Sequence, residues 1–196
     1  NNDCESVWLA MFQVGVLRRI ADICGKFDMK DKQKAYVSTA DELERQIEAV
    51  AWRGDRYARA IFADGSALGE EKDFIDILPQ AFAVLFDIGD GEKAKIAVNT
   101  AYERLFCPEI GVTRLLAPAF SESEAKKVGY IAEYPAGIRE NSGQYTHAAV
   151  WLAMALLKIG EREKGLKVLD GIVPIGRYEN SEKAAAYRAE PYLLAG

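Results

Sequence analysis

Apolar residues recur at intervals of three and four along much of this 196-residue chain, a spacing that places them on one face of an α-helix. Over residues 5–24 the pattern predicts a largely buried helix. Its periodic apolar positions are Trp8, Leu9, Phe12, Val16 and Ile20. Over residues 36–50 the apolar positions again step by four and three while charged residues fall mostly on the other face, so this helix is predicted to be half solvated.

Capping and helix-breaking residues set the limits of further predicted helices. One is expected over residues 76–89, where Pro79 falls in the first turn and removes no amide partner. The next, over residues 90–105, starts at an aspartate that suits the N-cap position. Two more are expected over residues 146–159 and 161–169, and an alternating strand pattern is almost absent. The chain therefore reads as an all-α domain of stacked helical hairpins.

A long irregular connection separates residues 106 and 144 and interrupts the helical pattern. It contains several prolines and glycines, and it far exceeds the usual connection of roughly 4–6 residues in compact domains. Ordered loops of this length are often functional. The connection leads into a polar run, residues 134–147, directly before an apolar helix, so the candidate chemistry is expected there.

The composition is that of a folded domain with a sizeable core, because 49% of the residues are hydrophobic and 28% are charged. The formal net charge of -5 gives no overall positive field, so nucleic acid and anionic membrane surfaces are unlikely main partners. A single histidine excludes a multi-histidine metal site, and no metal or cofactor is expected.

The cysteines and the apolar runs bear on location. Three cysteines without a close pair suggest neither a disulfide framework nor a zinc site, which favours a reducing, cytoplasmic setting. No apolar run approaches the ~20 residues that cross a bilayer, so no membrane association is expected for this segment. No basic, apolar leader precedes the first predicted helix, so the sequence gives no sign of secretion. A chain cut from a longer parent would not show such a leader.

Thr146 and His147 stand at the predicted start of the helix over residues 146–159. A helix N-terminus offers unpaired amides and a positive dipole, so these two residues and the nearby amides could hold an anion such as phosphate. The alternative is that Thr146 simply caps the helix and that His147 is hydrogen-bonded packing.

Further polar residues precede this helix start. Glu140 and Gln144 can bind hydroxyl groups, and Arg139 and Asn141 add hydrogen-bond donors.

The run Arg139-Glu-Asn-Ser-Gly-Gln-Tyr-Thr-His-Ala-Ala-Val-Trp151 resembles the signature of glycoside hydrolase family 94, the inverting glycoside phosphorylases, which also includes the phosphorylase-like region of cyclic β-1,2-glucan synthases. Further segments resemble the family in the same order. They are Glu5-Ser-Val-Trp8, Trp52-Arg-Gly-Asp-Arg-Tyr-Ala-Arg59, Asp64-Gly-Ser-Ala-Leu-Gly69, Ile75-Asp-Ile-Leu-Pro-Gln80 and Tyr187-Arg-Ala-Glu-Pro-Tyr192.

The resemblance implies that residues 1–196 are the C-terminal portion of an (α/α)6 barrel catalytic domain. In this family a carboxylic acid protonates the glycosidic oxygen of a β-glucoside while inorganic phosphate, the co-substrate, attacks the anomeric carbon to give an α-sugar 1-phosphate. By this resemblance His147 contacts phosphate and Glu140 lies in the subsite of the transferred glycosyl residue. For Gln80, Gln144 and Glu190 a contact with sugar and a packing role in the barrel wall are equally open.

Departures from the family pattern limit what the chain does alone. The family's general acid precedes the segment that begins at Glu5, so it is expected upstream of Asn1, and the isolated fragment is expected to be inactive. Arg56 stands where many members have tryptophan, Cys4 where glycine is frequent, and Ser142 where a second glycine is common.

Three functions remain open. The first is part of a phosphorolytic enzyme, expected as a homodimer in its full-length form. The second is a transglycosylating region of a cyclic β-1,2-glucan synthase, and the third is a non-catalytic helical module that binds carbohydrate.

Overall fold

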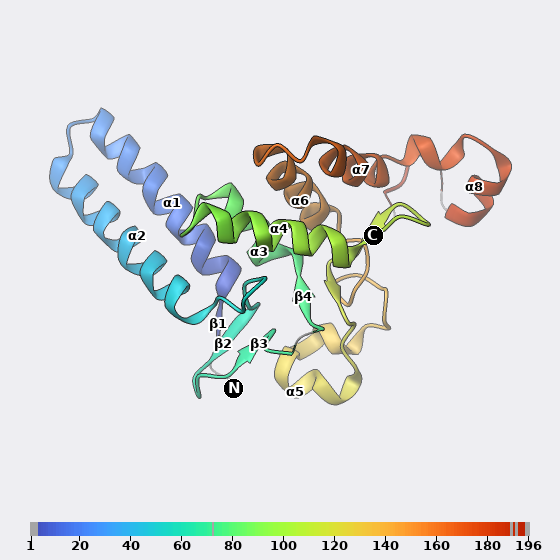
Figure 1. The fold of residues 1–196 in the computed structure, drawn as a ribbon, viewed down its shortest axis with the longest axis horizontal. Coiled ribbons are helices and arrows are strands. Elements are labelled where there is room, and N and C mark those ends of the chain that lie inside the picture. Colours follow the sequence, from blue (N-terminus) through green and yellow to red (C-terminus); the bar gives the residue numbers. More distant parts are fainter. Residues whose placement is uncertain (1–3, 72, 189, 191, 195–196) are drawn as a thin grey trace.

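The computed structural model describes residues 4–71, 73–188, 190 and 192–194, and this part of the chain is mostly helical. Its long helices form hairpins in chain order, with α3 packed between α1 and α6 (Figure 1). The predicted stacking of helical hairpins is confirmed in this part of the chain. The paired helices are α1 (Val7–Lys26) with α2 (Lys30–Val50), α3 (Ile77–Leu85) with α4 (Gly91–Leu105), and α6 (Thr146–Lys158) with α7 (Arg162–Ile172).

Local capping explains where α3 and α4 begin. The Asp76 carboxylate accepts a hydrogen bond from the Leu78 amide at 2.7 Å, and the Asp90 carboxylate accepts one from the Glu92 amide at 2.9 Å. The predicted start of each helix is therefore confirmed. The predicted end of the first of them at residue 89 is wrong, because α3 stops at Leu85 and a short turn leads on to α4.

The C-terminal end of α3 is bound by both neighbouring helices. Arg18 of α1 donates to the Phe86 and Asp87 carbonyls at 3.3 Å. Lys158 of α6 donates to the Val84 carbonyl at 2.9 Å and pairs with the Asp87 carboxylate at 2.8 Å. Because the last carbonyls of a helix lack partners within the helix, these two cations stabilise the end of α3.

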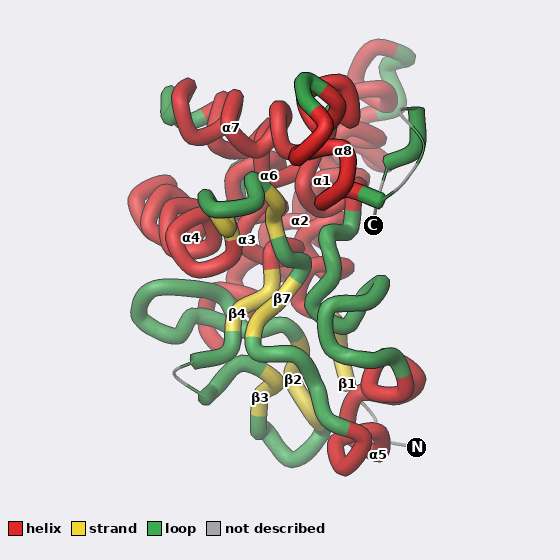
Figure 2. The backbone as a smooth tube through the Cα atoms, turned by 90° about the vertical axis from the view of Figure 1, so that its right-hand side faces the viewer, coloured by secondary structure: helices red, strands yellow, loops and turns green. Residues whose placement is uncertain are grey.

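Short strands lie at the end of the molecule where α1, α3 and α6 begin (Figure 2). Each has two or three residues, so the expected near-absence of strands needs correction: strands this short leave no alternating pattern. The antiparallel sets are β1 (Cys4–Ser6), β2 (Ala60–Phe62) and β3 (Ala67–Leu68); β4 (Ile75–Asp76) with β7 (Leu116–Ala117); and β5 (Phe106–Cys107) with β6 (Val112–Thr113).

The long connection after α4 is built from short elements and turns, as its proline and glycine content predicts. After β7 come 3-10 turns η1 (Glu122–Glu124) and η2 (Gly129–Glu133) around the one-turn helix α5 (Ala125–Val128). After α7 follow η3 (Pro174–Tyr178) and α8 (Ser181–Tyr187). None of the helices in the described residues is long and apolar enough to cross a membrane.

The core lies between the helices of the three hairpins and requires close approach at two glycines. A Cβ atom on Gly15 would lie 2.0 Å from the Phe86 ring, and one on Gly171 would lie 2.1 Å from the Gly111 carbonyl oxygen. The second approach joins the end of α7 to the turn between β5 and β6. The largest fully buried side chains include Met11, Ile77, Val98, Leu152 and Leu156.

A buried polar group ties the second helix to the strand end of the molecule. The Tyr57 hydroxyl donates to the Glu48 carboxylate at 2.6 Å, and Lys93 bonds to the other oxygen of that carboxylate at 2.9 Å. Burial, followed by the bond to Glu48, raises the pKa of the Tyr57 phenol far above its ordinary value.

Candidate functional site

The start of α6 directly follows the loop of residues 134–145. Its N-cap residue is Tyr145, which makes no side-chain capping bond, and Thr146 is already the first helical residue. The alternative that Thr146 caps the helix is therefore wrong. Because the first amides of a helix have no partner within the helix, this end has the donors and the dipole that bind an anion.

His147 is the second residue of α6, and its side chain is exposed. Its ring centroid lies 6.0 Å from the Tyr145 ring and 6.1 Å from the Trp151 ring. Trp151 in turn contacts Phe82 of α3 edge to face at 4.9 Å, which fixes the indole beside the imidazole. Because His147 is exposed, it is not part of the buried core.

Glu140 belongs to the loop of residues 134–145 that leads into α6. Its side chain is partly buried, and its Oε2 atom is buried without a hydrogen-bond partner among the described residues. A buried carboxylate oxygen without a partner is destabilising, so such an atom in a native structure calls for an explanation. Hydroxyl groups of a bound ligand would satisfy it.

Arg139 precedes Glu140 and is exposed. Its guanidinium carbon lies 5.3 Å from the centre of the Tyr134 ring, and its Nη1 donates to the Tyr134 hydroxyl at 3.2 Å. Tyr130, which is 58% exposed, stands edge to face against Tyr134 at 6.0 Å. Two tyrosine rings and a guanidinium near one of them thus form a partly exposed surface in the residues that precede Glu140.

Three predicted site residues use their side-chain amides inside the protein. Gln80 is fully buried; its Oε1 accepts from the Tyr57 amide at 2.7 Å, and its Nε2 donates to the Tyr57 and Asp76 carbonyls. Gln144 accepts from the Thr113 amide at 3.0 Å and is partly buried. Asn141 is fully buried, and within the described part of the chain its amide bonds to backbone groups. For Gln80 these contacts favour the packing alternative.

Six of the eight predicted residues lie in one segment of the chain, and two lie apart from it. The segment of residues 139–147 carries Arg139, Glu140, Asn141, Gln144, Thr146 and His147. Gln80 lies in α3, which packs against α6. Glu190 is exposed near the end of the chain, between two residues outside the described part.

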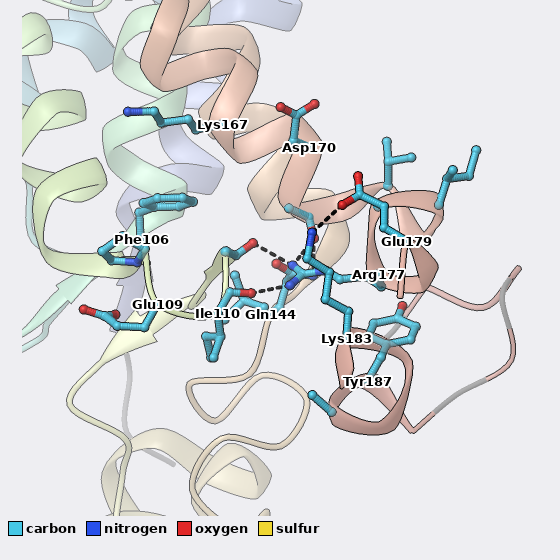
Figure 3. Close-up of a pocket in the computed structure, with 18 of the residues that line it drawn as sticks. Phe106, Glu109, Ile110, Gln144, Lys167, Asp170, Arg177, Glu179, Lys183 and Tyr187 are labelled. Carbon is cyan, nitrogen blue, oxygen red and sulfur yellow. Dashed lines mark hydrogen bonds and ion pairs between the residues drawn. The ribbon is translucent and has the colours of Figure 1, made fainter. Parts of the chain in front are cut away.

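A cavity of about 1090 Å³ lies on the α7 and α8 side of the same loop (Figure 3). Gln144 and Gly137 contribute to its lining, together with residues from the β5–β6 turn and from η3. The Arg177 guanidinium, which also lines the cavity, donates to the carbonyls of Gly111 at 2.7 Å and Gly171 at 2.9 Å. His147 and Glu140 do not line this cavity.

The aromatic surroundings of the site were missed by reasoning from the sequence. Tyr130, Tyr145 and Trp151 were not assigned, although the close spacing of Tyr130 and Tyr134 before the signature is a visible signal. No cluster of three or more residues able to hold a metal ion occurs among the described residues.

Comparison with known proteins places the chain in a family. The family model "Glycosyl hydrolase 94 superfamily, catalytic domain" matches residues 1–196, so the chain belongs to this family and the resemblance read from its motifs is confirmed.

Individual relatives have two kinds of activity. The chain is 32% identical over 97% of its length to cyclic beta-(1,2)-glucan synthase NdvB of Rhizobium meliloti (strain 1021), and 26% identical over 97% to N,N'-diacetylchitobiose phosphorylase of Vibrio proteolyticus. It is 25% identical over 87% to 3-O-beta-D-glucopyranosyl-beta-D-glucuronide phosphorylase of Paenibacillus borealis. The chain spans 7%, 24% and 22% of these proteins, respectively.

Proposed function

We propose that this chain is part of an inverting glycoside phosphorylase, which cleaves a β-linked glucoside with inorganic phosphate and releases an α-sugar 1-phosphate. One observation carries the proposal. A single segment, residues 139–147, holds a carboxylate oxygen that is buried without a partner among the described residues, and an exposed histidine at a helix start without a side-chain cap among them. A sugar hydroxyl and a phosphate need these two kinds of group.

The proposed reaction assigns roles to the two ends of this segment. Phosphate is already anionic, so it needs donors to hold it and no second carboxylate to activate it. His147, Thr146 and the first amides of α6 supply these donors. Glu140 accepts hydrogen bonds from hydroxyls of the transferred glycosyl unit. The general acid of this reaction would lie in a part of the protein outside these residues, so we expect the chain alone to be inactive.

The exposed surface of Tyr130, Tyr134 and Arg139 suits the sugar side of the same reaction. Aromatic rings present flat apolar faces, and the phenol and guanidinium groups donate to hydroxyls. Its position directly before Glu140 supports a contact with the β-glucoside. The surface of Tyr130, Tyr134 and Arg139 would therefore bind sugar, and the start of α6 would bind phosphate.

The arrangement of the hairpins supports an (α/α)6 barrel, of which residues 1–196 would form the C-terminal portion. In this reading α1, α3 and α6 are inner helices, and each pairs with the outer helix that follows it. Leu9 is 51% exposed and Phe12 is 42% exposed on α1, and such apolar surface fits a contact with further helices of the same barrel.

The test is phosphorolysis by the full-length protein. We expect sugar 1-phosphate from at least one β-linked glucose disaccharide in the presence of phosphate. His147→Ala should raise the KM for phosphate by about 10–100-fold, because it removes one charge-assisted hydrogen bond to phosphate. The KM for sugar should change much less. Lys34→Ala, an exposed change on α2, is the control. Equal rises of both KM values, or no product from any linkage, would refute the proposal.

A second candidate is the transglycosylating region of a cyclic β-1,2-glucan synthase. The higher identity to NdvB, 32% against 26% for the chitobiose phosphorylase, favours it. The same full-length protein would then convert linear β-1,2-linked glucans to cyclic products without phosphate. Product analysis with and without phosphate separates the two activities.

The remaining parts of the proposal concern the setting of the enzyme. Phosphate is a co-substrate, and no cofactor is invoked. The three free cysteines are compatible with a reducing, cytoplasmic location. A homodimer is proposed for the full-length protein, and sedimentation velocity would test it.

A further inference from the structure

We propose that Asn141 is a positioning residue that holds the 134–145 loop so that Glu140 meets the sugar, and that it makes no contact with substrate itself. The inference rests on the proposed function for the role of Glu140. It replaces the expectation that Asn141 donates to the ligand.

Among the described residues, the side-chain hydrogen bonds of Asn141 run to backbone groups. Its Oδ1 accepts from the Phe120 amide at 2.7 Å, while its Nδ2 donates to the Phe120 carbonyl at 2.9 Å and to the Tyr134 carbonyl at 2.8 Å. The side chain therefore pairs with both polar groups of Phe120, as a neighbouring strand would. Since the residue is 0% exposed, no donor remains for a ligand.

The backbone of Asn141 closes the loop on itself. Its amide donates to the Ile138 carbonyl at 3.0 Å, and its carbonyl accepts from the Gly137 amide at 2.8 Å. The turn includes two non-glycine residues in the left-handed region, Arg139 at φ 49° and Ser142 at φ 72°. Such conformations are unfavourable and persist only where surrounding contacts impose them.

A second anchor holds the far side of the loop. The Ser142 hydroxyl donates to the Leu116 carbonyl at 2.7 Å, and the Leu115 amide donates to the Gly143 carbonyl at 2.8 Å. Phe120 is itself fixed, because its ring stacks on Phe74 at 5.4 Å. Asn141 thus connects a rigid segment to the turn that carries Glu140.

The consequence concerns the unpaired oxygen of Glu140. A free loop would turn this carboxylate toward water, because an unsatisfied buried oxygen is destabilising. The bonds of the neighbouring Asn141 prevent that movement. The carboxylate is therefore held in the orientation that a sugar hydroxyl would meet, and it does not need to reorganise when the sugar binds.

Asn141→Asp in the full-length enzyme is the test. The aspartate keeps the acceptor for the Phe120 amide and loses both donations to carbonyls. We expect the KM for the β-linked disaccharide to rise about 10–100-fold, the effect of a displaced binding group, while the KM for phosphate changes less than about twofold because α6 is unaltered. Hydrogen exchange of residues 134–143 should also accelerate.

Val98→Ala is the matched control, because it removes buried side-chain volume in α4 away from the loop. It should lower the melting temperature and leave the ratio of the two KM values unchanged. The positioning role is overturned if Asn141→Asp behaves like this control, or if both KM values rise equally.

Direct binding separates failure of this inference from failure of the proposed function. If the wild-type protein releases no sugar 1-phosphate, the proposed function is wrong. Calorimetric titration with the same disaccharide then still tests Asn141, because the variant should bind it about 10-fold more weakly. Equal binding by wild type and variant, or no binding by either, overturns the role.

Discussion

Gln80 offers a test that separates the two roles left open for it, because its amide is fully buried and bonds to the Tyr57 amide, the Tyr57 carbonyl and the Asp76 carbonyl. Gln80→Leu keeps a similar volume and removes all three bonds. The substitution therefore removes hydrogen bonds from buried polar groups and changes the packing little. A sugar-binding role would instead need these same amide atoms to face the ligand.

The stability lost in Gln80→Leu follows from the backbone groups that would lose their hydrogen-bond partner. A buried polar group without a partner is destabilising by about 1–3 kcal/mol, and the Tyr57 amide has one hydrogen to place while each carbonyl has a second lone pair. We therefore expect a loss of about 2–5 kcal/mol, which is a large share of the roughly 5–15 kcal/mol of a typical domain.

Urea unfolding followed by tryptophan fluorescence measures this loss, with Gln46→Leu as the matched control. Gln46 is exposed on α2, so its replacement should change stability by less than about 0.5 kcal/mol. An unchanged urea midpoint for Gln80→Leu would refute the structural role. If the KM for sugar rose in that same stable variant, Gln80 would instead be a sugar contact.

Two further predictions concern stability. Gly171→Ala should destabilise the protein by about 1–3 kcal/mol through overpacking, because its Cβ would lie 2.1 Å from the Gly111 carbonyl oxygen. Gly91→Ala is the control and should not destabilise the protein, because a Cβ there meets open space. Equal shifts of the melting temperature in the two variants would contradict this prediction. Tyr57→Phe should lose about 1–3 kcal/mol at pH 7 with its bond to Glu48. The unfolded phenol ionises near pH 10 while the folded one, with its raised pKa, stays neutral. The advantage of the wild type should therefore shrink as pH rises above about 10, and a difference that grew there would oppose the argument.

Local chemistry explains which parts of the fold could be read from the sequence. Asp76 and Asp90 marked two helix starts because a cap bonds to an amide two residues away. The strands escaped notice because two or three residues are too few to alternate. The end of α3 was misplaced at Gly89, since the contacts that bind that end come from helices distant in sequence.

The same distinction holds for the site. The run that ends in His147 was recognisable because the helix start and the family signature lie within one short segment. The buried roles of Gln80 and Asn141 were not recognisable, because their backbone partners, Tyr57 and Phe120, lie 23 and 21 residues away. Side-chain type alone does not tell whether an amide faces a ligand or a distant backbone.

The end of α3 has a consequence for how the hairpins can be separated. Arg18 of the α1–α2 hairpin and Lys158 of the α6–α7 hairpin both donate to carbonyls at the end of α3. Deleting or unfolding either of these hairpins would therefore leave carbonyls of the α3–α4 hairpin without a hydrogen-bond partner. Repeat proteins gain or lose units freely because each unit contacts its neighbours through equivalent surfaces. Here the three hairpins share one helix end, and we expect them to unfold as a single cooperative unit that tolerates neither internal deletion nor circular rearrangement at the α3–α4 turn.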